Sequence, residues 1–275
     1  MRIRRSRVAL VAGLIGVSLL FLMPQFWLLS LSLKQKAAVY EFPPRWVPSN
    51  PSLDNYAFAL TGTQVPWYLV NSVTVAVLAT LLTMAAGVPA AYALSRERFR
   101  GRGTLLAVLL GVQMLSPVIL LLPIYELVNA MRLVDTHAGL IVVYAAIQTP
   151  FTVWVLKNFF DALPPALFEA ARLDGATRLR TLRSIALPLV GPGLASVAIF
   201  NLAAYWSEFA LALVLLDSQA RFTVPIGIFN LQSGYETEWQ IVAAASFIGL
   251  VPMMAAFILL QRYFIAGLTA GAIKG

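Results

Sequence analysis

The sequence contains no cysteine and a single histidine, and these shortages remove several classes of function. A chain of 275 residues without cysteine forms no disulfide framework, and it carries no thiol nucleophile, cysteine metal ligand or lipoprotein-type anchor. The one histidine, His137, stands in a short polar segment, which favours an exposed loop residue over a ligand or catalytic base. There is no H-E-x-x-H motif and no histidine placed for a catalytic triad. We therefore expect neither a metal site nor an intramembrane enzyme.

A phosphate-binding loop is also missing. No segment matches G-x-x-x-x-G-K-[ST], the loop whose main-chain N–H groups hold the phosphates of a nucleotide. We therefore expect that this chain does not bind or hydrolyse ATP, that it needs no cofactor of its own, and that it is not an enzyme.

Charge is scarce and apolar residues are abundant. Charged residues make up 12% of the chain, about half the fraction found in soluble proteins, while hydrophobic residues make up 60%. No water-soluble domain of this length needs so much apolar material, so the composition indicates a polytopic membrane protein. The net charge of +8 suggests nucleic-acid binding at first sight. The basic residues fall between apolar stretches, however, where they suit membrane topology, and we expect no nucleic-acid partner.

Six apolar stretches are long enough to cross the hydrocarbon core, which requires about 20 helical residues. None shows the ten-residue alternation of an outer-membrane barrel. The sequence therefore predicts an all-α polytopic membrane protein with six transmembrane helices, in which residues 1–275 form a single membrane domain. The predicted spans are 8–32, 68–94, 104–127, 138–157, 186–214 and 240–262.

The lysines and arginines predict the orientation. With the N-terminus in the cytoplasm, 15 of the 20 basic residues face the cytosol, as the positive-inside rule requires, and six spans return the C-terminus to the same side. The first span is too long for the apolar region of a signal peptide and lacks a clear cleavage site, so we expect it to stay uncleaved. The five basic residues left outside are Lys34, Lys36, Arg45, Arg132 and Arg221.

A polar segment, residues 158–185, separates the fourth and fifth predicted spans. Glu169–Leu173 is good helix-forming sequence, and Gly175 permits the positive φ that closes a helix. A second helix is able to start after Ala176. This pattern predicts a cytoplasmic helix–turn–helix suited to docking. The alternative is an amphipathic linker that rests on anionic lipid headgroups.

Polar side chains inside the fifth predicted span are candidates for a solute pathway. Asn201, Tyr205 and Glu208 are spaced four and three residues apart and so lie on one face of a continuous helix, with Trp206 beside them. A proton relay, a structural hydrogen-bond partner or a position near the wet interface are the alternatives for Glu208. The polar segment Leu231–Trp239 predicts a projecting outer loop or an ordinary connector.

The order Glu169-Ala-Ala, three residues, Gly175 and then Ile185-x-Leu-Pro188 resembles the EAA loop of ABC importer permeases, which seats in a cleft of an ATPase subunit. The resemblance covers nearly the whole chain from residue 8. It points to the smaller, six-span permease of carbohydrate importers of the maltose-transporter type. The other segments that carry it are Leu53-Asp-Asn-Tyr-Ala-Phe58, Asn71-Ser-Val73, Ala91-Tyr-Ala-Leu-Ser-Arg96 and the tail Gln261–Gly275.

The resemblance implies partners and contact residues. A second, related permease would pair with this chain in the cytoplasmic (inner) membrane, and two ATPase subunits carrying ATP and Mg²⁺ would lie beneath them. An extracytoplasmic solute-binding protein would deliver a small-molecule solute, and the tail Gly267–Gly275 would run toward the ATPase pair. The ATPase-coupling residues implied are Glu169, Ala170, Ala171, Leu173, Asp174 and Gly175. Those implied for binding-protein contact are Gln232, Ser233, Gly234, Tyr235 and Glu236.

The function expected on this basis is binding-protein-dependent import of a sugar or sugar-like solute by alternating access. A glycerophosphodiester or polyol importer shares the same pattern. A self-sufficient secondary transporter would use Glu208 as an ion-coupling carboxylate, and a non-transporting membrane anchor or sensor is a further alternative. These last two explain neither the Glu169 segment nor the C-terminal tail.

Overall fold

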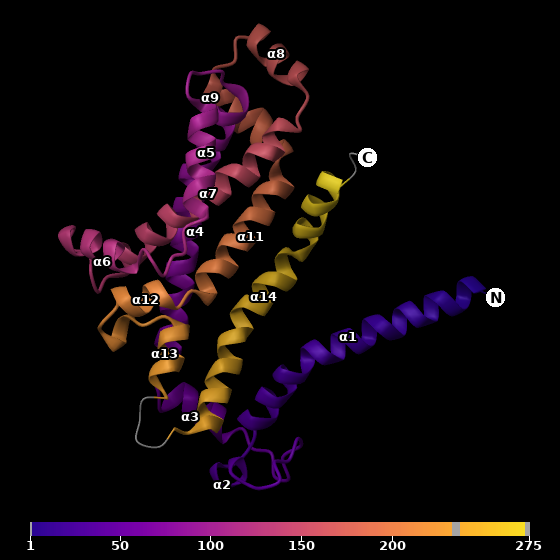
Figure 1. Ribbon diagram of the computed structural model, residues 1–275, viewed down its shortest axis with the longest axis vertical. Coiled ribbons are helices and arrows are strands. Elements are labelled where there is room, and N and C mark those ends of the chain that lie inside the picture. The colour runs from indigo at the N-terminus through magenta and orange to yellow at the C-terminus, as the bar shows by residue number, and fades with distance from the viewer. Residues whose placement is uncertain (1, 233–236, 273–275) are drawn as a thin grey trace. The chain divides into compact units, whose positions relative to one another are not determined.

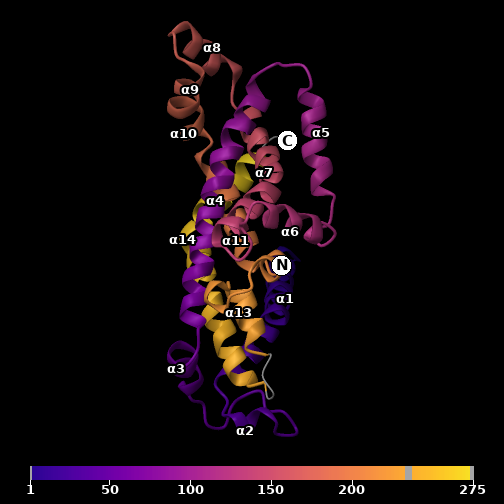
Figure 2. The same cartoon turned by 90° about the vertical axis from the view of Figure 1, so that its left-hand side faces the viewer.

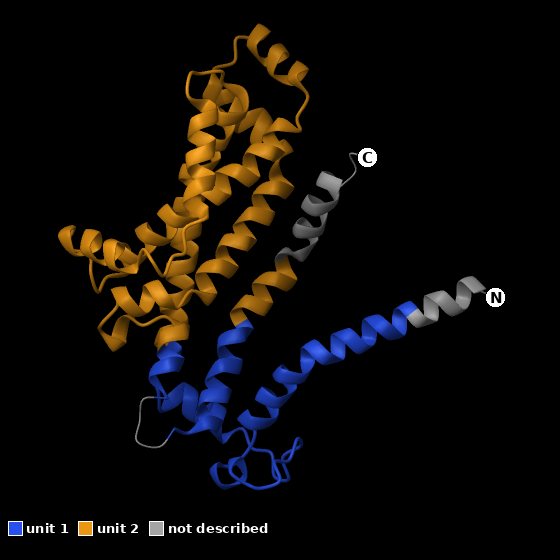
Figure 3. Ribbon diagram, in the orientation of Figure 1, with its two compact units in different colours: residues 1–66, 227–251 blue, residues 67–226, 252–275 orange. Residues whose placement is uncertain are grey.

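The structure is a computed structural model that describes residues 2–232 and 237–272. Every regular element within these residues is a helix (Figure 1). The predicted all-α class is therefore confirmed. The chain divides into two compact units, drawn in blue and orange in Figure 3. The first comprises residues 1–66 and 227–251, and the second comprises residues 67–226 and 252–275.

Among the described residues, four helices contain segments long and apolar enough to cross a membrane. They are α1 (Arg2–Ser32), α4 (Val65–Arg96), α7 (His137–Asp161) and α14 (Trp239–Ala272). Each contains a proline, and each continues through it, which is common in membrane helices because neighbouring groups satisfy the freed carbonyl. These helices match the first, second, fourth and sixth predicted spans.

The third predicted span, 104–127, is not one helix. It consists of α5 (Arg102–Gln113) and α6 (Leu121–Ala130), joined by a turn. Pro117 lies in that turn. Its ring disfavours helical geometry at Ser116, and it has no N–H to offer a helical carbonyl. Hydropathy alone does not detect this break because the turn is itself apolar.

The fifth predicted span, 186–214, is also interrupted. The helical segment Arg178–Leu189 meets α11 (Gly191–Ser207) at an angle of 80°, and α12 (Ala210–Leu215) follows as a separate short helix. Pro192 cannot donate the main-chain bond that would continue the preceding helix toward Pro188. By length and composition the described residues thus contain four spanning helices, or five when the bent pair counts as one. Six spans and the side on which each terminus lies stay predictions.

In the first unit, a buried lysine organises the chain after α1. Lys34 is 2% exposed, its Nζ donates to the Arg45 carbonyl at 2.6 Å, and it lies 4.6 Å from the Trp27 ring centroid. Asn55 donates to the Ser32 carbonyl at 2.9 Å and to the Lys34 carbonyl at 2.8 Å, so α3 (Asp54–Thr61) is tied to the end of α1. The short helix α2 (Lys36–Val39) follows α1, and α13 (Val224–Asn230) precedes α14.

The second unit contains two apolar clusters. One gathers Val75, Leu140, Tyr144 and Tyr205 with their neighbours, from α4, α7 and α11, together with side chains of α6 and α12. The other gathers Tyr92, Phe160, Phe168 and Leu182, from the ends of α4 and α7 and from the polar segment that follows α7. The second cluster fixes the predicted docking element to the helices, and it is therefore where the candidate site is built.

Candidate functional site

The predicted helix–turn–helix is present. Its first helix, α8 (Pro165–Leu173), begins with proline in its first turn, where a missing N–H costs nothing. It ends at Leu173, and Gly175, two residues further on, has φ +73°. The Gly175 N–H donates to the Arg172 carbonyl at 3.1 Å and the Ala176 N–H to the Ala171 carbonyl at 2.9 Å, the paired bonds of a Schellman motif. The structure thus confirms that Gly175 closes this helix.

The second helix starts three residues later. The Thr177 side chain accepts the Arg180 N–H at 3.3 Å and so caps α9 (Arg178–Thr181), which continues as a π-helical turn over Leu182–Ala186 and then α10 (Leu187–Leu189). The wider turn places Leu182 and Ala186 in the second apolar cluster. Figure 2 shows α8, α9 and α10 following one another at the end of the unit where α4 also ends.

The two faces of α8 differ. Phe168 and Ala171 are 7% and 4% exposed, and Phe168 packs into the second apolar cluster. Ala170 is exposed, and so is Glu169, which borders the cavity beside α8. Leu173, at the end of the helix, is 89% exposed. A helix that holds one face in a core and presents a carboxylate and a bare leucine on the other is suited to contact a partner protein.

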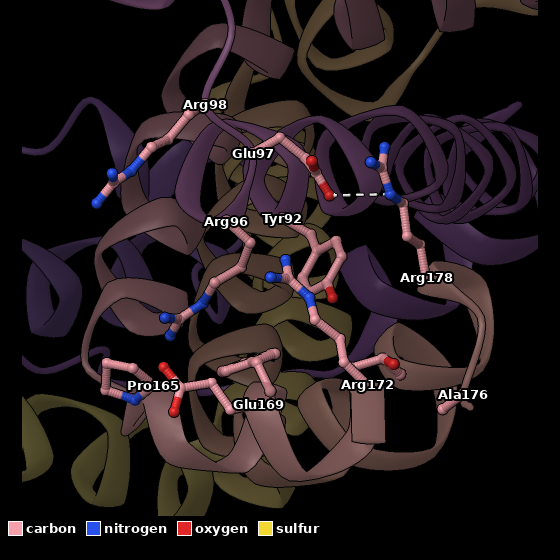
Figure 4. Close-up of a pocket in the computed structure, with 11 residues that line it drawn as sticks. Tyr92, Arg96, Glu97, Arg98, Pro165, Glu169, Arg172, Ala176 and Arg178 are labelled. Carbon is pink, nitrogen blue, oxygen red and sulfur yellow. Dashed lines mark ion pairs between the residues drawn. The ribbon is translucent and has the colours of Figure 1, made fainter. Parts of the chain in front are cut away.

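A cavity of about 520 Å³ lies between α8 and the end of α4 (Figure 4). Glu97 and Arg178 pair across it, with Oε1 and Nε 3.2 Å apart, and thereby connect the end of α4 to the start of α9. The remaining lining residues are Tyr92, Arg96, Arg98, Pro165, Phe168, Glu169, Arg172, Ala176 and Thr181.

Three of the four residues predicted for a solute pathway lie within α11, and the fourth, Glu208, lies beyond its end. Asn201 is fully buried and its Nδ2 donates to Thr152 Oγ1 at 3.0 Å. Tyr205 is buried, with its hydroxyl 2.6 Å from that of Thr83, and Trp206 is partly buried on the same helix. Glu208 lies beyond the end of α11 with extended backbone. The prediction that Glu208 shares a helical face with Asn201 and Tyr205 is therefore wrong, because the helix ends at Ser207.

The Glu208 side chain caps the next helix from the residue before its N-cap, Phe209. Its carboxylate accepts the Leu211 N–H at 2.9 Å and the Ala212 N–H at 3.1 Å, at the start of α12. The Tyr144 hydroxyl donates to the same carboxylate at 2.7 Å, and the Tyr144 ring stacks on Tyr205 with centroids 5.2 Å apart. Glu208 and Tyr205 are thus brought together through Tyr144.

The sequence did contain a signal for these missed partners. Tyr144, Gln148 and Thr152 recur every four residues and so share one face of α7. The polar groups of α11 therefore meet a polar stripe on a neighbouring helix. The assignment of the α11 residues to a solute pathway stays a prediction.

The predicted binding-protein contact falls mostly outside the described residues. Gln232 is described, and its carbonyl accepts the Thr237 hydroxyl at 3.1 Å. Ser233, Gly234, Tyr235 and Glu236 lie outside the described residues. The C-terminal tail is described as helix through Ala272, and residues 273–275 lie outside.

Comparison with known proteins places the chain among transport permeases. Residues 83–269 match the family described as binding-protein-dependent transport system inner membrane component. The chain is 35% identical to the sulfoquinovosyl glycerol transport system permease protein of Agrobacterium fabrum, over 92% of this chain and 89% of that protein. It is also 35% identical to the trehalose/maltose transport system permease protein of Thermococcus litoralis, over 98% of each chain.

A solved structure agrees in fold. One chain of a bacterial ABC transporter involved in the import of the acidic polysaccharide alginate superposes with a TM-score of 0.81 at 22% identity, covering 96% of this chain and 98% of that chain. The fold, the apolar helices and the family match agree with one another. The chain belongs to the family of binding-protein-dependent transport system inner membrane components, the multi-pass inner-membrane permeases of ABC importers.

Proposed function

We propose that this chain imports a sugar or sugar-like solute as one of two permeases in a complex with two ATPase subunits and an extracytoplasmic binding protein. The assignment of the solute rests on the relatives, whose names include trehalose/maltose, sulfoquinovosyl glycerol and arabinooligosaccharide transport. The observation that carries the rest is α8, which has a buried inner face and an outer face made of Glu169, Ala170 and Leu173.

The coupling role follows from how α8 is held. Residues Glu169, Ala170, Ala171, Leu173, Asp174 and Gly175 would form the contact with an ATPase subunit, and ATP with Mg²⁺ would be bound there and not in this chain. The closed turn at Gly175 and the buried Phe168 fix the orientation of α8 on the helices that it packs against. A partner bound to the outer face of α8 would therefore move those helices with it. Such movement drives alternating access only to the extent that nucleotide favours one state over the other.

The proposal is tested by a charge reversal at the outer face. In reconstituted vesicles that contain both permeases, the ATPase subunits and the binding protein, we expect Glu169→Lys to lower ATP-driven uptake at least about tenfold. A repelled or unpaired charge at an interface costs more than the roughly 1.4 kcal/mol that a tenfold change requires.

The matched control is Asp217→Lys, the same charge reversal at an exposed residue in the segment after α12. We expect it to leave both ATPase binding and ATP stimulation of uptake unchanged. Normal assembly and normal uptake by the Glu169→Lys complex would show that α8 is not the ATPase contact.

A further inference from the structure

Arg96, the last residue of α4, contacts two other parts of the second apolar cluster. They are the end of α7 and the segment that leads from α7 to α8. Arg96 Nη2 donates to the Phe160 carbonyl, in the last turn of α7, and to the Leu163 carbonyl at 2.9 Å, in the segment that leads to α8. Its Cζ lies 3.9 Å from the centroid of the Phe168 ring on α8. One guanidinium therefore joins the end of α4 to the end of α7 and to the predicted coupling helix.

Aromatic rings complete this contact. The Tyr92 ring, one helical turn before Arg96, meets the Phe160 ring edge-on with centroids 5.6 Å apart. The same Tyr92 ring lies 6.2 Å from the Phe168 ring. We name the set Tyr92, Arg96, Phe160 and Phe168 the Arg96 joint. Phe168 is the large side chain that α8 buries, so the joint is the main attachment of α8 to the helices behind it.

The chemistry of the joint requires arginine. A planar guanidinium donates to two carbonyls in its own plane and stacks a face on an aromatic ring at the same time, whereas an ammonium has no face to stack. The positive charge also stands at the negative end of the α7 dipole. Nε of Arg96 is buried and has no hydrogen-bond partner among the described residues, so stacking and the Nη2 bonds hold the side chain.

The cavity beside the joint is less suited to be a ligand site. Arg178 is paired with Glu97, and Arg96 is engaged by the two carbonyls and the Phe168 ring. Arg98 and Arg172 are exposed at the rim. Figure 4 shows Arg96, Arg172 and Tyr92 among the side chains that line the cavity. The cavity leaves one side of α8 uncovered, so the position of the helix depends on the Arg96 joint.

We propose that Arg96 is a positioning residue that transmits movement of α8 to α4 and α7 through the face of Phe168. This inference rests on the proposed coupling role of α8. A shift of α8 moves the Phe168 ring, and the stacked guanidinium carries that shift to the carbonyls at the end of α7. When the stack is lost, α8 still folds and still docks, but its movement is no longer passed on fully.

The experiment measures solute taken up per ATP hydrolysed by the reconstituted complex. We expect Phe168→Leu, which keeps an apolar side chain but removes the ring face, and Arg96→Lys, which keeps the charge, each to lower this ratio about fivefold. Phe168→Trp retains a ring face for the guanidinium, and we expect it to restore at least half of the wild-type ratio. Arg98→Lys, two residues along and exposed, is the matched control and should leave the ratio unchanged.

Assembly and unfolding temperature separate positioning from simple stability. The proposal requires Phe168→Leu to retain the ATPase subunits and most of its ATP hydrolysis while uptake falls. A wild-type ratio in both Phe168→Leu and Arg96→Lys would overturn the proposal, as would uptake that falls only in proportion to lost complex. If Arg96→Lys fails to assemble, Phe168→Leu decides. If Glu169→Lys uncouples transport but Phe168→Leu behaves as the wild type, the proposed role of the Arg96 joint is refuted and the coupling role of α8 stands. If Glu169→Lys behaves as the wild type, the coupling role of α8 is itself refuted.

Discussion

Replacing Glu208 with alanine tests what the polar residues of α11 and α12 do. In the structure the Glu208 carboxylate accepts three hydrogen bonds, from the Tyr144 hydroxyl at 2.7 Å and from the N–H groups of Leu211 and Ala212 at 2.9 and 3.1 Å. Alanine removes both acceptor oxygens and with them all three hydrogen bonds. The change therefore leaves the start of α12 uncapped and a buried tyrosine hydroxyl without its partner.

The size of the effect follows from these contacts. Loss of a capping side chain costs about 1 kcal/mol. A buried hydroxyl left without a partner costs about 1–3 kcal/mol, and the two losses share one carboxylate, so they do not add fully. We therefore expect Glu208→Ala to lower the free energy of unfolding by less than the full sum, by about 1–3 kcal/mol. Tyr144→Phe removes the hydroxyl alone and should cost less, and the double variant should cost less than the sum of the two single changes.

The measurement combines thermal unfolding of the purified permease at one scan rate with the KM for solute in the assembled importer. Glu126→Ala, an exposed glutamate on α6, is the matched control and should change neither quantity. We expect Glu208→Ala to lower the unfolding midpoint while KM stays within about twofold of the wild type. An unchanged midpoint with a much higher KM would refute this reasoning. It would show that the carboxylate binds solute, as the sequence pattern predicts.

Two further predictions concern the start of α7. A Cβ at Gly139 would meet the carbonyl oxygen of Leu133, which belongs to the main chain and cannot move aside. Gly139→Ala should therefore lower the unfolding midpoint. The control is Gly111→Ala, which has open space around it and should leave the midpoint equal or raise it. Burial acts to raise the pKa of Asp135, but hydrogen bonds from Ser218 and its neighbour and the charge of a nearby arginine outweigh it and hold the pKa below its usual value. Because the pKa of Asp135 is lower in the folded protein, the ionised carboxylate stabilises the fold above the unfolded pKa of about 4, and this contribution is lost as pH falls through the folded pKa. The difference in unfolding midpoint between the wild type and Asp135→Asn should therefore be present at about pH 6 and shrink as pH falls below about 4. Equal unfolding midpoints for Gly139→Ala and Gly111→Ala would contradict the contact with Leu133. A midpoint difference between the wild type and Asp135→Asn that persists in acid would contradict the contacts of Asp135.

Local patterns were enough to predict α8 and the turn that closes it. A proline pair starts α8, good helix formers continue it, and glycine alone adopts the φ of +73° at its end without strain, so the helix and its turn are set by neighbouring residues. The same holds for α4 and α7, whose apolar lengths exceed what a bilayer requires. Prolines are able to kink or break a helix, but hydropathy alone does not divide the spans near Pro117 and Pro192, because it averages over a window and takes no account of a missing N–H.

By itself, the sequence determined the helical class, the membrane location, the family and the place of the helix–turn–helix around Gly175. The helical class, the membrane location and the helix–turn–helix depend on composition, on apolar length and on short-range backbone preferences, and the family follows from motifs along the chain. The tertiary structure alone decided that Glu208 caps α12 instead of extending α11, and that Tyr144 joins it to Tyr205. It also decided that Arg96 reaches Phe168, which is 72 residues away along the chain. Partners so distant in sequence are selected by how the helices pack, and the spacing of residues along one helix contains no record of what lies opposite it.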